Sequence, residues 1–273
     1  MQLRFVHDAA ARVDSASLEV AITDDVGVAC AYSAWHAGRG WVHIPDVVDF
    51  SFDSASSVVH AHVERGGTQE LAIDAYYGMG LPLALQATRR QEVIHASANA
   101  SSSGVIGFCG ASQQGKSTIA HGLALRGHAL WADDALAFKT QLESVLATAL
   151  PFKPKLRPAT LDFFDSNSAE ATEDAPMVPA WSTSKLRALF VLTPLARTNA
   201  TERIEVSELS AGEALGAILP HGFRFKPTST EHDNATLTAY ADLVTHTPVF
   251  RMSFVRKLDG LASLLDRIEK EIR

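Results

Sequence analysis

Residues 104–138 constrain the fold more than any other part of the 273-residue chain. They contain the pattern G-x-x-x-x-G-K-[ST]. In a loop of this kind, backbone N–H groups surround phosphates, the Lys reaches the β- and γ-phosphate oxygens, and the hydroxyl holds Mg²⁺. The pattern therefore predicts a phosphate-binding loop, and its nucleotide contacts are Gly110, Ala111, Ser112, Gln113, Gln114, Gly115, Lys116, Ser117 and Thr118.

The residues on either side of this loop predict the context that it needs. Residues 105–109 form a short apolar run typical of a buried strand, and residues 119–124 carry apolar side chains at helical spacing. Gly127 follows where a glycine commonly ends a helix. The order strand, glycine loop, helix directs the positive end of a helix toward a bound anion. The alternative is an ordinary glycine turn before a helix.

Two adjacent carboxylates follow the next predicted strand, residues 129–131. Asp133 and Asp134 come at the end of that strand, where ligands bind in open α/β sheets. Near a triphosphate, one carboxylate can hold Mg²⁺ together with Ser117, and the other can accept a proton from an attacking hydroxyl. We assign the metal to Asp133 and Ser117. The alternative is a solvated Asp-Asp turn.

These residues resemble a known family. The run GKSTIAHGLALRGHALWADD, residues 115–134, is similar to the corresponding segment of the HPr kinase/phosphorylase family, including R-G-H before the strand and A-D-D after it. Residues 93–97, VIHAS, resemble the strand that carries the active-site His of that family. A weaker resemblance extends through the C-terminal half, including residues 248–254. The chain looks closest to divergent HPr-kinase-like proteins, some of which are peptide kinases in lasso-peptide gene clusters.

The resemblance implies an α/β fold, with an HPr-kinase-type P-loop domain over residues 91–273 and an N-terminal β-rich domain with short helices over residues 1–90. It implies an ATP- and Mg²⁺-dependent kinase that transfers the γ-phosphate to a Ser or Thr hydroxyl of a protein or peptide, a lasso-type precursor peptide among them. A lone His in an apolar strand is usually a satisfied core residue. The resemblance instead makes His95 catalytic, together with Lys116, Asp133 and Asp134.

Two departures from the family pattern bear on the reaction. Gln113 stands where family loops usually carry Gly, which affects the conformation of the loop and its nucleotide affinity. The later family signature, R-G-[LI]-G with its acidic metal ligand, does not occur in the sequence. Its absence argues against HPr as the acceptor and against the reverse, phosphorolytic reaction. Two alternatives stay open: a nucleotide-binding sensor or scaffold without kinase activity, and a small-molecule kinase.

Charge and cysteine content exclude several other classes. A net charge of -7 disfavours nucleic acid as a partner. Apolar runs are too short to cross a bilayer, and acidic residues interrupt the N-terminal region, so we expect a cytoplasmic protein without a membrane partner. Cys30 and Cys109 are too few for a disulfide framework, and we expect both to be reduced. Without H-E-x-x-H or C-x-x-C patterns, we expect no structural metal site.

Outside the loop region the pattern alternates between strands and helices. We expect short strands at residues 18–22, 27–32, 41–44 and 57–63 in a small antiparallel sheet. His60 and His62 share one side of the last of these strands, and we interpret them as an exposed face because no third ligand accompanies them. Residues 68–90 predict two short helices with a break near Gly78, Gly80 and Pro82. Residues 93–98 and 105–109 predict an antiparallel pair that brings His95 to the loop.

The second half of the chain predicts further strands and helices around a proline-rich loop. Residues 151–158 predict an extended loop, whose basic side chains Lys153, Lys155 and Arg157 either clamp an anion or are solvated. Residues 165–180 predict a loop or lid. Strands are expected at 144–149, 186–192 and 249–254, and helices after the Ser210–Glu213 capping box and at 236–247. The last helix, residues 258–272, has an apolar stripe that serves either as a dimer seam or as a face docked on its own sheet, so a homo-oligomer stays open.

Overall fold

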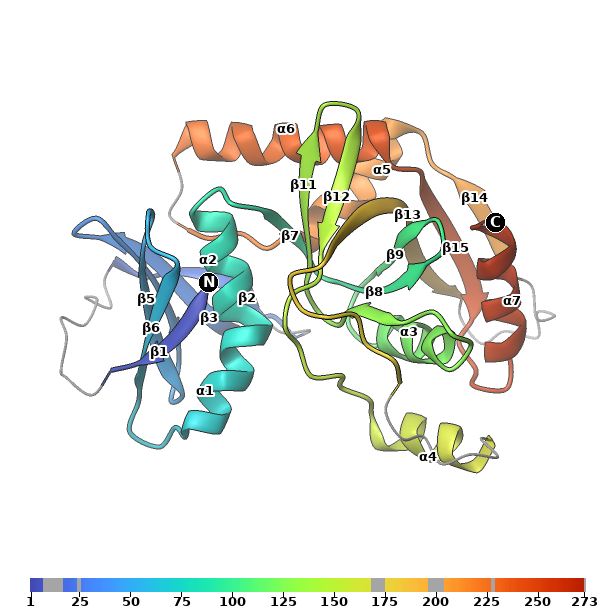
Figure 1. Cartoon of the computed structure of the whole chain (residues 1–273), viewed down its shortest axis with the longest axis horizontal. Coiled ribbons are helices and arrows are strands. Elements are labelled where there is room, and N and C mark those ends of the chain that lie inside the picture. Colours follow the sequence, from blue (N-terminus) through green and yellow to red (C-terminus); the bar gives the residue numbers. More distant parts are fainter. Residues whose placement is uncertain (7–16, 24–25, 168–174, 196–203, 227–228, 273) are drawn as a thin grey trace. The chain divides into compact units, whose positions relative to one another are not determined.

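The computed structural model describes residues 1–6, 17–23, 26–167, 175–195, 204–226 and 229–272 (Figure 1). It is a mixed α/β structure with two sheets, divided into two compact units. One unit comprises Met1–Val93 and Gly222–Leu237, and the other comprises Ile94–His221 and Thr238–Arg273. The sequence expectation assigned all residues after 90 to one domain, whereas the segment Gly222–Leu237 belongs to the N-terminal unit.

Short-range contacts explain why this segment belongs to the N-terminal unit. The Phe225 ring lies 5.5 Å from Trp35 and 5.8 Å from Phe52, measured between ring centroids. The Phe225 N–H donates to Oε1 of Gln86, and the Lys226 N–H donates a 2.7 Å hydrogen bond to the Ser33 hydroxyl. A buried aromatic ring and paired backbone donors therefore attach the segment to the N-terminal sheet.

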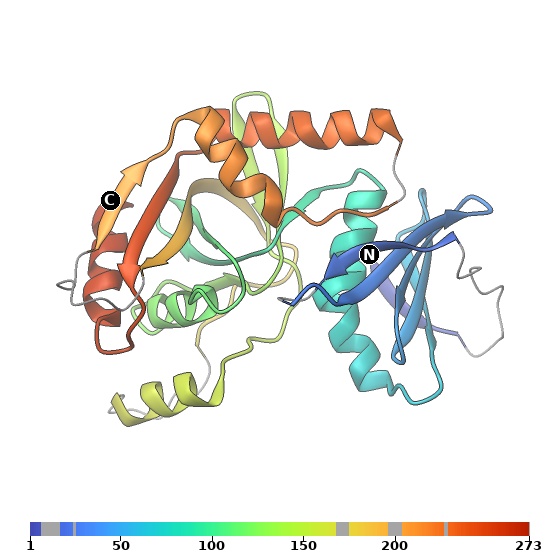
Figure 2. The ribbon, with the colours of Figure 1, turned by 180° about the vertical axis from the view of Figure 1, so that it is seen from behind.

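The N-terminal unit contains a six-stranded sheet in the order β1-β6-β5-β4-β3-β2. Figure 2 shows this sheet, in shades of blue, from behind. Its neighbours pair antiparallel except β1 with β6, which are parallel. All four expected strands are present with shifted ends, and the sequence analysis did not detect β1 and β5. The strands are β1 (Gln2–Phe5), β2 (Glu19–Thr23), β3 (Ala29–His36), β4 (Arg39–Ile44), β5 (Val48–Asp53) and β6 (Val58–Val63).

One helical run packs on this sheet, and the expected break in it is wrong. The run comprises α1 (Gln69–Ala75), a π-helical segment (Tyr76–Gly80) and α2 (Leu81–Ala87). The Leu81 N–H donates to the Tyr76 carbonyl five residues earlier, so the chain stays helical just before Pro82, which has no N–H to donate. Gly80 permits close packing, because a Cβ there would lie 2.8 Å from the Phe50 ring.

In the second unit, the sheet runs in the order β10-β8-β9-β13-β12-β11, and β15 pairs with both β13 and β14. Strands β9, β13 and β15 are mutually parallel. The strands are β8 (Ala96–Ser101), β9 (Gly104–Cys109), β10 (Leu130–Ala132), β11 (Leu136–Gln141), β12 (Ser144–Thr148), β13 (Thr183–Leu195), β14 (Glu205–Glu208) and β15 (Val249–Val255), and β7 (Glu92–Ile94) spans the boundary between the units.

Helices cover both faces of this sheet. On one face, α3 (Lys116–Ala124) and α7 (Leu261–Glu271) share a core with Phe108 and Phe190. The apolar stripe of α7 is therefore docked on its own sheet. On the other face, α5 (Ala211–Ile218) and α6 (Thr230–His246) contribute Ile218, Tyr240 and Leu243 to a core with Phe138.

Several local expectations are confirmed and others are wrong. The Ser210–Glu213 capping box is present, with the Ser210 N–H 3.0 Å from Oε2 of Glu213. The expected strand at 93–98 is interrupted at His95, and α6 begins six residues before the expected Thr236. Residues 151–157 are irregular as expected, but α4 (Pro158–Asn167) was not predicted. Of the expected loop at 165–180, residues 168–174 lie outside the described residues. No helix within the described ranges is long and apolar enough to cross a membrane.

Candidate functional site

Strand register brings the predicted site residues to one edge of the second sheet. Ala96 of β8 pairs with Cys109 of β9, so His95 lies beside the start of the glycine loop. Ala132 of β10 pairs with Ala98 of β8, and β10 runs parallel to β9, so the two aspartates that follow β10 reach the same edge. Strand β15 runs parallel to β9, so the residues that follow β15 lie at this edge as well.

The loop between β9 and α3 is a tight turn that depends on two glycines. Gly115 has φ +102° at the N-cap of α3, a left-handed conformation that favours glycine. A Cβ at Gly110 would meet the side-chain oxygen of Gln114, which accepts a 2.9 Å hydrogen bond from the Ala111 N–H. Gln113 is also left-handed, with φ +64°, although it is not a glycine. The sequence departure at Gln113 therefore falls on a backbone conformation that glycine adopts more readily.

Lys116 lies at the centre of this loop with only 6% of its surface exposed. Its ammonium Nζ donates to the Gly110 carbonyl at 2.9 Å and to the Ala111 carbonyl at 3.1 Å. The first-turn amides of α3 have no intrahelical acceptor, because the helix begins at this residue. A cation and a set of backbone donors thus surround the same small space, which is an arrangement that suits an anion.

Asp133 is a buried carboxylate held by three donors. Its Oδ1 accepts hydrogen bonds from the Ser117 hydroxyl at 2.8 Å and from the Ser97 hydroxyl at 2.9 Å. Its Oδ2 accepts a 3.0 Å bond from the Lys155 N–H. Burial raises the pKa of Asp133, the neighbouring Asp134 raises it further, and the three hydrogen bonds lower it. The carboxylate therefore connects the start of α3 to the end of β10 and to the 151–157 loop.

His95 contacts the second aspartate through the backbone. Its Nδ1 lies 2.9 Å from the Asp134 carbonyl oxygen, and because a carbonyl only accepts, Nδ1 carries the hydrogen. Burial lowers the pKa of His95, as does the charge of Lys116, so the ring is neutral at pH 7 and Nε2 is its acceptor nitrogen. Asp134 has φ +68°, a strained conformation for a non-glycine residue.

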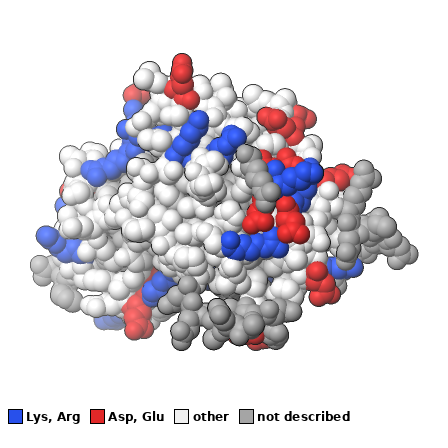
Figure 3. Space-filling view, turned by 45° about the vertical axis from the view of Figure 1, so that its right-hand side comes forward, with Lys and Arg blue, Asp and Glu red and all other residues white. Residues whose placement is uncertain are grey.

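Most of these groups line a cavity of about 560 Å³. Five cationic side chains line it, whereas Asp134 is the one carboxylate among the described residues that line it. This concentration of positive charge occurs in a chain of net charge -7. On the face shown in Figure 3, Lys and Arg lie beside Asp and Glu, with wide uncharged areas between them. The cations that line the cavity are Lys116, Lys155, Arg157, Arg256 and Lys257.

The structure brings most of the predicted site residues to this cavity. Those that line it are His95, Ser112, Gln113, Gly115, Lys116, Ser117, Thr118 and Asp134. Gly110, Ala111 and Gln114 form the rest of the loop, and Asp133 lies behind Ser117. Of the basic residues in the proline-rich loop, Lys155 and Arg157 line the cavity.

Three residues of the site were not predicted from the sequence. Ser97, Arg256 and Lys257 contribute a donor to Asp133 and two cations to the cavity, and Arg256 donates to the Gln113 carbonyl. A signal for each exists in the sequence. Ser97 follows His95 by two residues, and the basic pair begins two residues after the predicted strand 249–254, at the end where ligands bind in such sheets.

Comparison with known proteins shows a distant structural likeness only. No family model matches the chain, and no curated protein matches it. Among solved structures, the chain is similar to the Hpr(Ser) kinase/phosphatase from Coxiella burnetii. The two chains are 12% identical, with a TM-score of 0.34, over 66% of this chain and 89% of the other.

Proposed function

We propose that this chain is an ATP- and Mg²⁺-dependent kinase that transfers the γ-phosphate to a Ser or Thr hydroxyl of a protein or peptide. The observation that carries the proposal is that Lys116 and Asp134 line one cavity whose other cations also suit a polyanion. A triphosphate is such a polyanion, and the glycine loop before α3 supplies the backbone donors that phosphates need.

The residues beside the loop fit Mg²⁺. The Ser117 hydroxyl and Oδ1 of Asp133 are oxygen donors 2.8 Å apart, and Mg²⁺ prefers oxygen ligands while keeping several waters. Ser117 and Asp133 would therefore hold the ion. When bound there, Mg²⁺ would neutralise the negative charge that develops during phosphoryl transfer.

The side chains of this site have separable roles in phosphoryl transfer. Lys116 exchanges its loop carbonyl partners for β- and γ-phosphate oxygens. The acceptor hydroxyl oxygen forms a bond to the γ-phosphorus, its proton passes to the Asp134 carboxylate, and the bond to the β,γ-bridging oxygen breaks so that ADP leaves. His95 holds the Asp134 backbone through its Nδ1–H and so orients the base. Positioning and charge neutralisation supply most of the rate.

A second candidate is a nucleotide-binding sensor or scaffold that does not transfer phosphate. The observation that favours it is the left-handed conformation of Gln113, which costs on the order of 1–2 kcal/mol relative to glycine. This cost destabilises the loop in the conformation that the structure shows. A sensor would use the cationic cavity equally well, but it gives no role to the Asp134 carboxylate in that cavity or to His95, which contacts the Asp134 backbone, so the kinase is the better-supported function.

The direct test measures transfer of labelled γ-phosphate from ATP to pools of Ser- and Thr-containing peptides. We expect transfer by the unmodified chain and a loss of at least about 1000-fold in Lys116→Ala and in Asp134→Asn. Lys139→Ala, at an exposed lysine of β11, is the matched control and should keep full activity.

Three other results would each contradict the proposal. Unchanged transfer in either site variant would remove the assigned roles. Binding of ATP without transfer to any peptide would favour the sensor. Transfer to small hydroxyl compounds with no transfer to peptides would favour the small-molecule kinase.

A further inference from the structure

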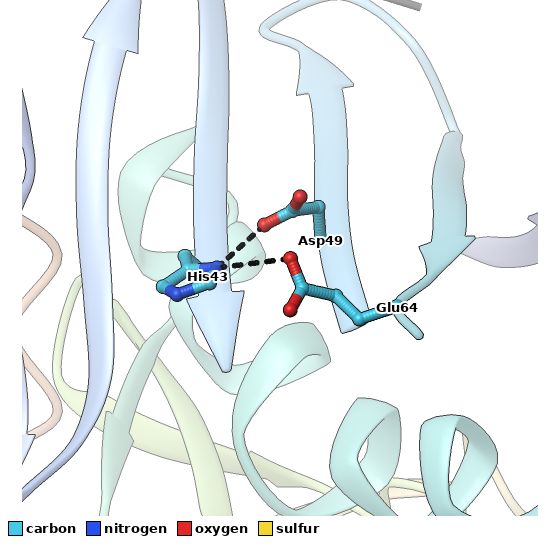
Figure 4. Close-up of side chains that lie close together, drawn as sticks. All are labelled: His43, Asp49 and Glu64. Atoms are coloured by element: carbon cyan, nitrogen blue, oxygen red, sulfur yellow. Dashed lines mark hydrogen bonds and ion pairs between the residues drawn. The ribbon is translucent and has the colours of Figure 1, made fainter. Parts of the chain in front are cut away.

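Three side chains that bind metals well converge on the sheet of the N-terminal unit (Figure 4). His43 comes from β4, Asp49 from β5, and Glu64 follows the end of β6. Nδ1 of His43 lies 2.7 Å from Oδ1 of Asp49 and 4.0 Å from Oε1 of Glu64. One ligand atom from each residue lies within 4.8 Å of the other two.

The backbone fixes the positions of these side chains. His43 and Asp49 are directly paired in the β4–β5 register, so their side chains share one face of the sheet. The Glu64 N–H donates a 3.0 Å bond to the Val47 carbonyl, which ties the end of β6 to the turn between β4 and β5. The Gly67 N–H then donates to the Glu64 carbonyl at 3.1 Å. Backbone hydrogen bonds therefore hold the chain in place at or beside each of the three residues.

The charges of the cluster suit a divalent cation. Two carboxylates and an imidazole face one another with side-chain exposures of 16%, 22% and 25% for Asp49, Glu64 and His43. A divalent ion bound by these three side chains would balance the charges of both carboxylates. Partly buried carboxylates that lie this close together repel each other unless a cation balances them.

We propose that His43, Asp49 and Glu64 form a site for a divalent transition metal such as Zn²⁺. Nδ1 of His43 and one oxygen from each carboxylate supply three ligands, and water takes the fourth position. Zn²⁺ with bonds of about 2.1 Å places tetrahedral ligand atoms roughly 3.4 Å apart. The observed separations of 2.7 Å and 4.0 Å lie on either side of that value. The site cross-links β4, β5 and the end of β6.

This site is separate from the proposed Mg²⁺ ligands Ser117 and Asp133, which lie in the other unit. Mixed nitrogen and oxygen ligands suit zinc, whereas Mg²⁺ favours oxygen alone. The cluster has no H-E-x-x-H or C-x-x-C signature, because its members are spaced by six and fifteen residues, on β4, on β5 and just after β6. The competing interpretation is a cross-strand His43–Asp49 hydrogen bond that binds no metal.

Calorimetric titration of the full chain with Zn²⁺ tests the proposal. We expect one zinc per chain, with affinity weakened more than about 100-fold in His43→Ala and in Glu64→Gln, since loss of an outer partner alone costs 10–100-fold. His60→Gln changes a histidine of the same sheet outside the cluster, and Asp133→Asn removes the proposed Mg²⁺ ligand. Both controls should bind zinc as the unmodified chain does.

A second measurement uses only the unmodified chain, so its result does not depend on whether the variants fold. X-ray absorption of the zinc-loaded protein should show one imidazole nitrogen and otherwise oxygen ligands at the metal. Absence of zinc binding, zinc binding that survives both His43→Ala and Glu64→Gln, or a spectrum with two or more imidazoles would each overturn the assignment.

Discussion

The Ser117 hydroxyl donates a 2.8 Å hydrogen bond to Oδ1 of Asp133, joining the first turn of α3 to the end of β10. Ser97 of β8 donates to the same oxygen at 2.9 Å. Three elements that are separate in sequence therefore meet at one buried carboxylate. Because a buried charge without donors is costly, these hydrogen bonds favour the ionised carboxylate and oppose the rise in the pKa of Asp133 that burial and Asp134 cause.

Ser97→Ala should narrow the pH range of activity on the acid side. Burial already raises the pKa of Asp133, and the Ser97 hydrogen bond lowers it, so removing that donor raises the pKa further. Protonated Asp133 is a poor metal ligand, so the acid limb of kcat/KM against pH should move to higher pH. A hydrogen bond to a charged group contributes about 1.5–3 kcal/mol, which corresponds to a rate loss of about 10- to 100-fold on that limb.

The matched control for this pH profile is Ser103→Ala, at a serine in the exposed turn between β8 and β9. It should leave the profile unchanged. An equal rate loss at every pH in Ser97→Ala would show that the serine acts through packing instead of through the Asp133 proton.

Gly122→Ala should leave the chain less stable than Gly216→Ala does, although both replace a helical glycine. A Cβ at Gly122 would lie 2.8 Å from Leu265 of α7, whereas a Cβ at Gly216 of α5 would meet nothing within 4 Å. Alanine in place of a helical glycine stabilises by about 1 kcal/mol at either position, but overpacking between α3 and α7 costs about 1–3 kcal/mol at Gly122. Urea unfolding measures both changes. Equal effects of the two substitutions would contradict the tight docking of α7 on α3.

Glu92→Gln should stabilise the chain above neutral pH. Burial raises the pKa of Glu92 to about 7, and its Oε2 has no hydrogen-bond partner among the described residues. A carboxyl whose pKa is raised by folding contributes its full stability below the unfolded pKa, and that contribution is lost as the pH rises through 7. The amide carries no charge and retains an oxygen for the Thr236 hydroxyl, which lies 3.2 Å from Oε1 of Glu92.

The expected gain from Glu92→Gln at about pH 8 is on the order of 1–3 kcal/mol in the free energy of unfolding, and it should vanish near pH 5. Denaturant unfolding of both proteins across this pH range measures it. Glu70→Gln, at an exposed glutamate of α1, is the control and should change little. A gain that does not depend on pH would show that the Glu92 charge is not its cause.

The local elements of the site could be predicted because each has its own sequence signal. The glycine pattern, the apolar run before it and the helical spacing after it indicated β9, the loop and α3, and Asp133–Asp134 indicated the end of β10. These features depend on residues that are neighbours in the chain. The α/β class was what the family resemblance implied, and the structure is indeed a mixed α/β structure with two sheets.

Features that arise from long-range pairing could not be predicted. Gly222–Leu237 belongs to the N-terminal unit through Phe225, and Glu92 meets Thr236 across 144 residues. The hydrophobic periodicity of a sequence does not predict contacts between residues so far apart. The sequence predicts a helix break where the structure has the π-helical segment Tyr76–Gly80, because glycine and proline signals do not distinguish a break from a wider helical turn. Ser97 was overlooked because a buried serine shows its role only when its acceptor is known.

The most direct test of the central claim is a calorimetric titration of the full chain with a non-hydrolysable ATP analogue, with and without Mg²⁺. We expect one nucleotide per chain, tighter binding with Mg²⁺, and a large loss of affinity in Lys116→Ala, whose Nζ lies among the loop carbonyls. Asp133→Asn should keep nucleotide binding but lose its dependence on Mg²⁺. Failure of the unmodified chain to bind the nucleotide, or unchanged binding in Lys116→Ala, would contradict the claim that this cavity is a nucleotide site.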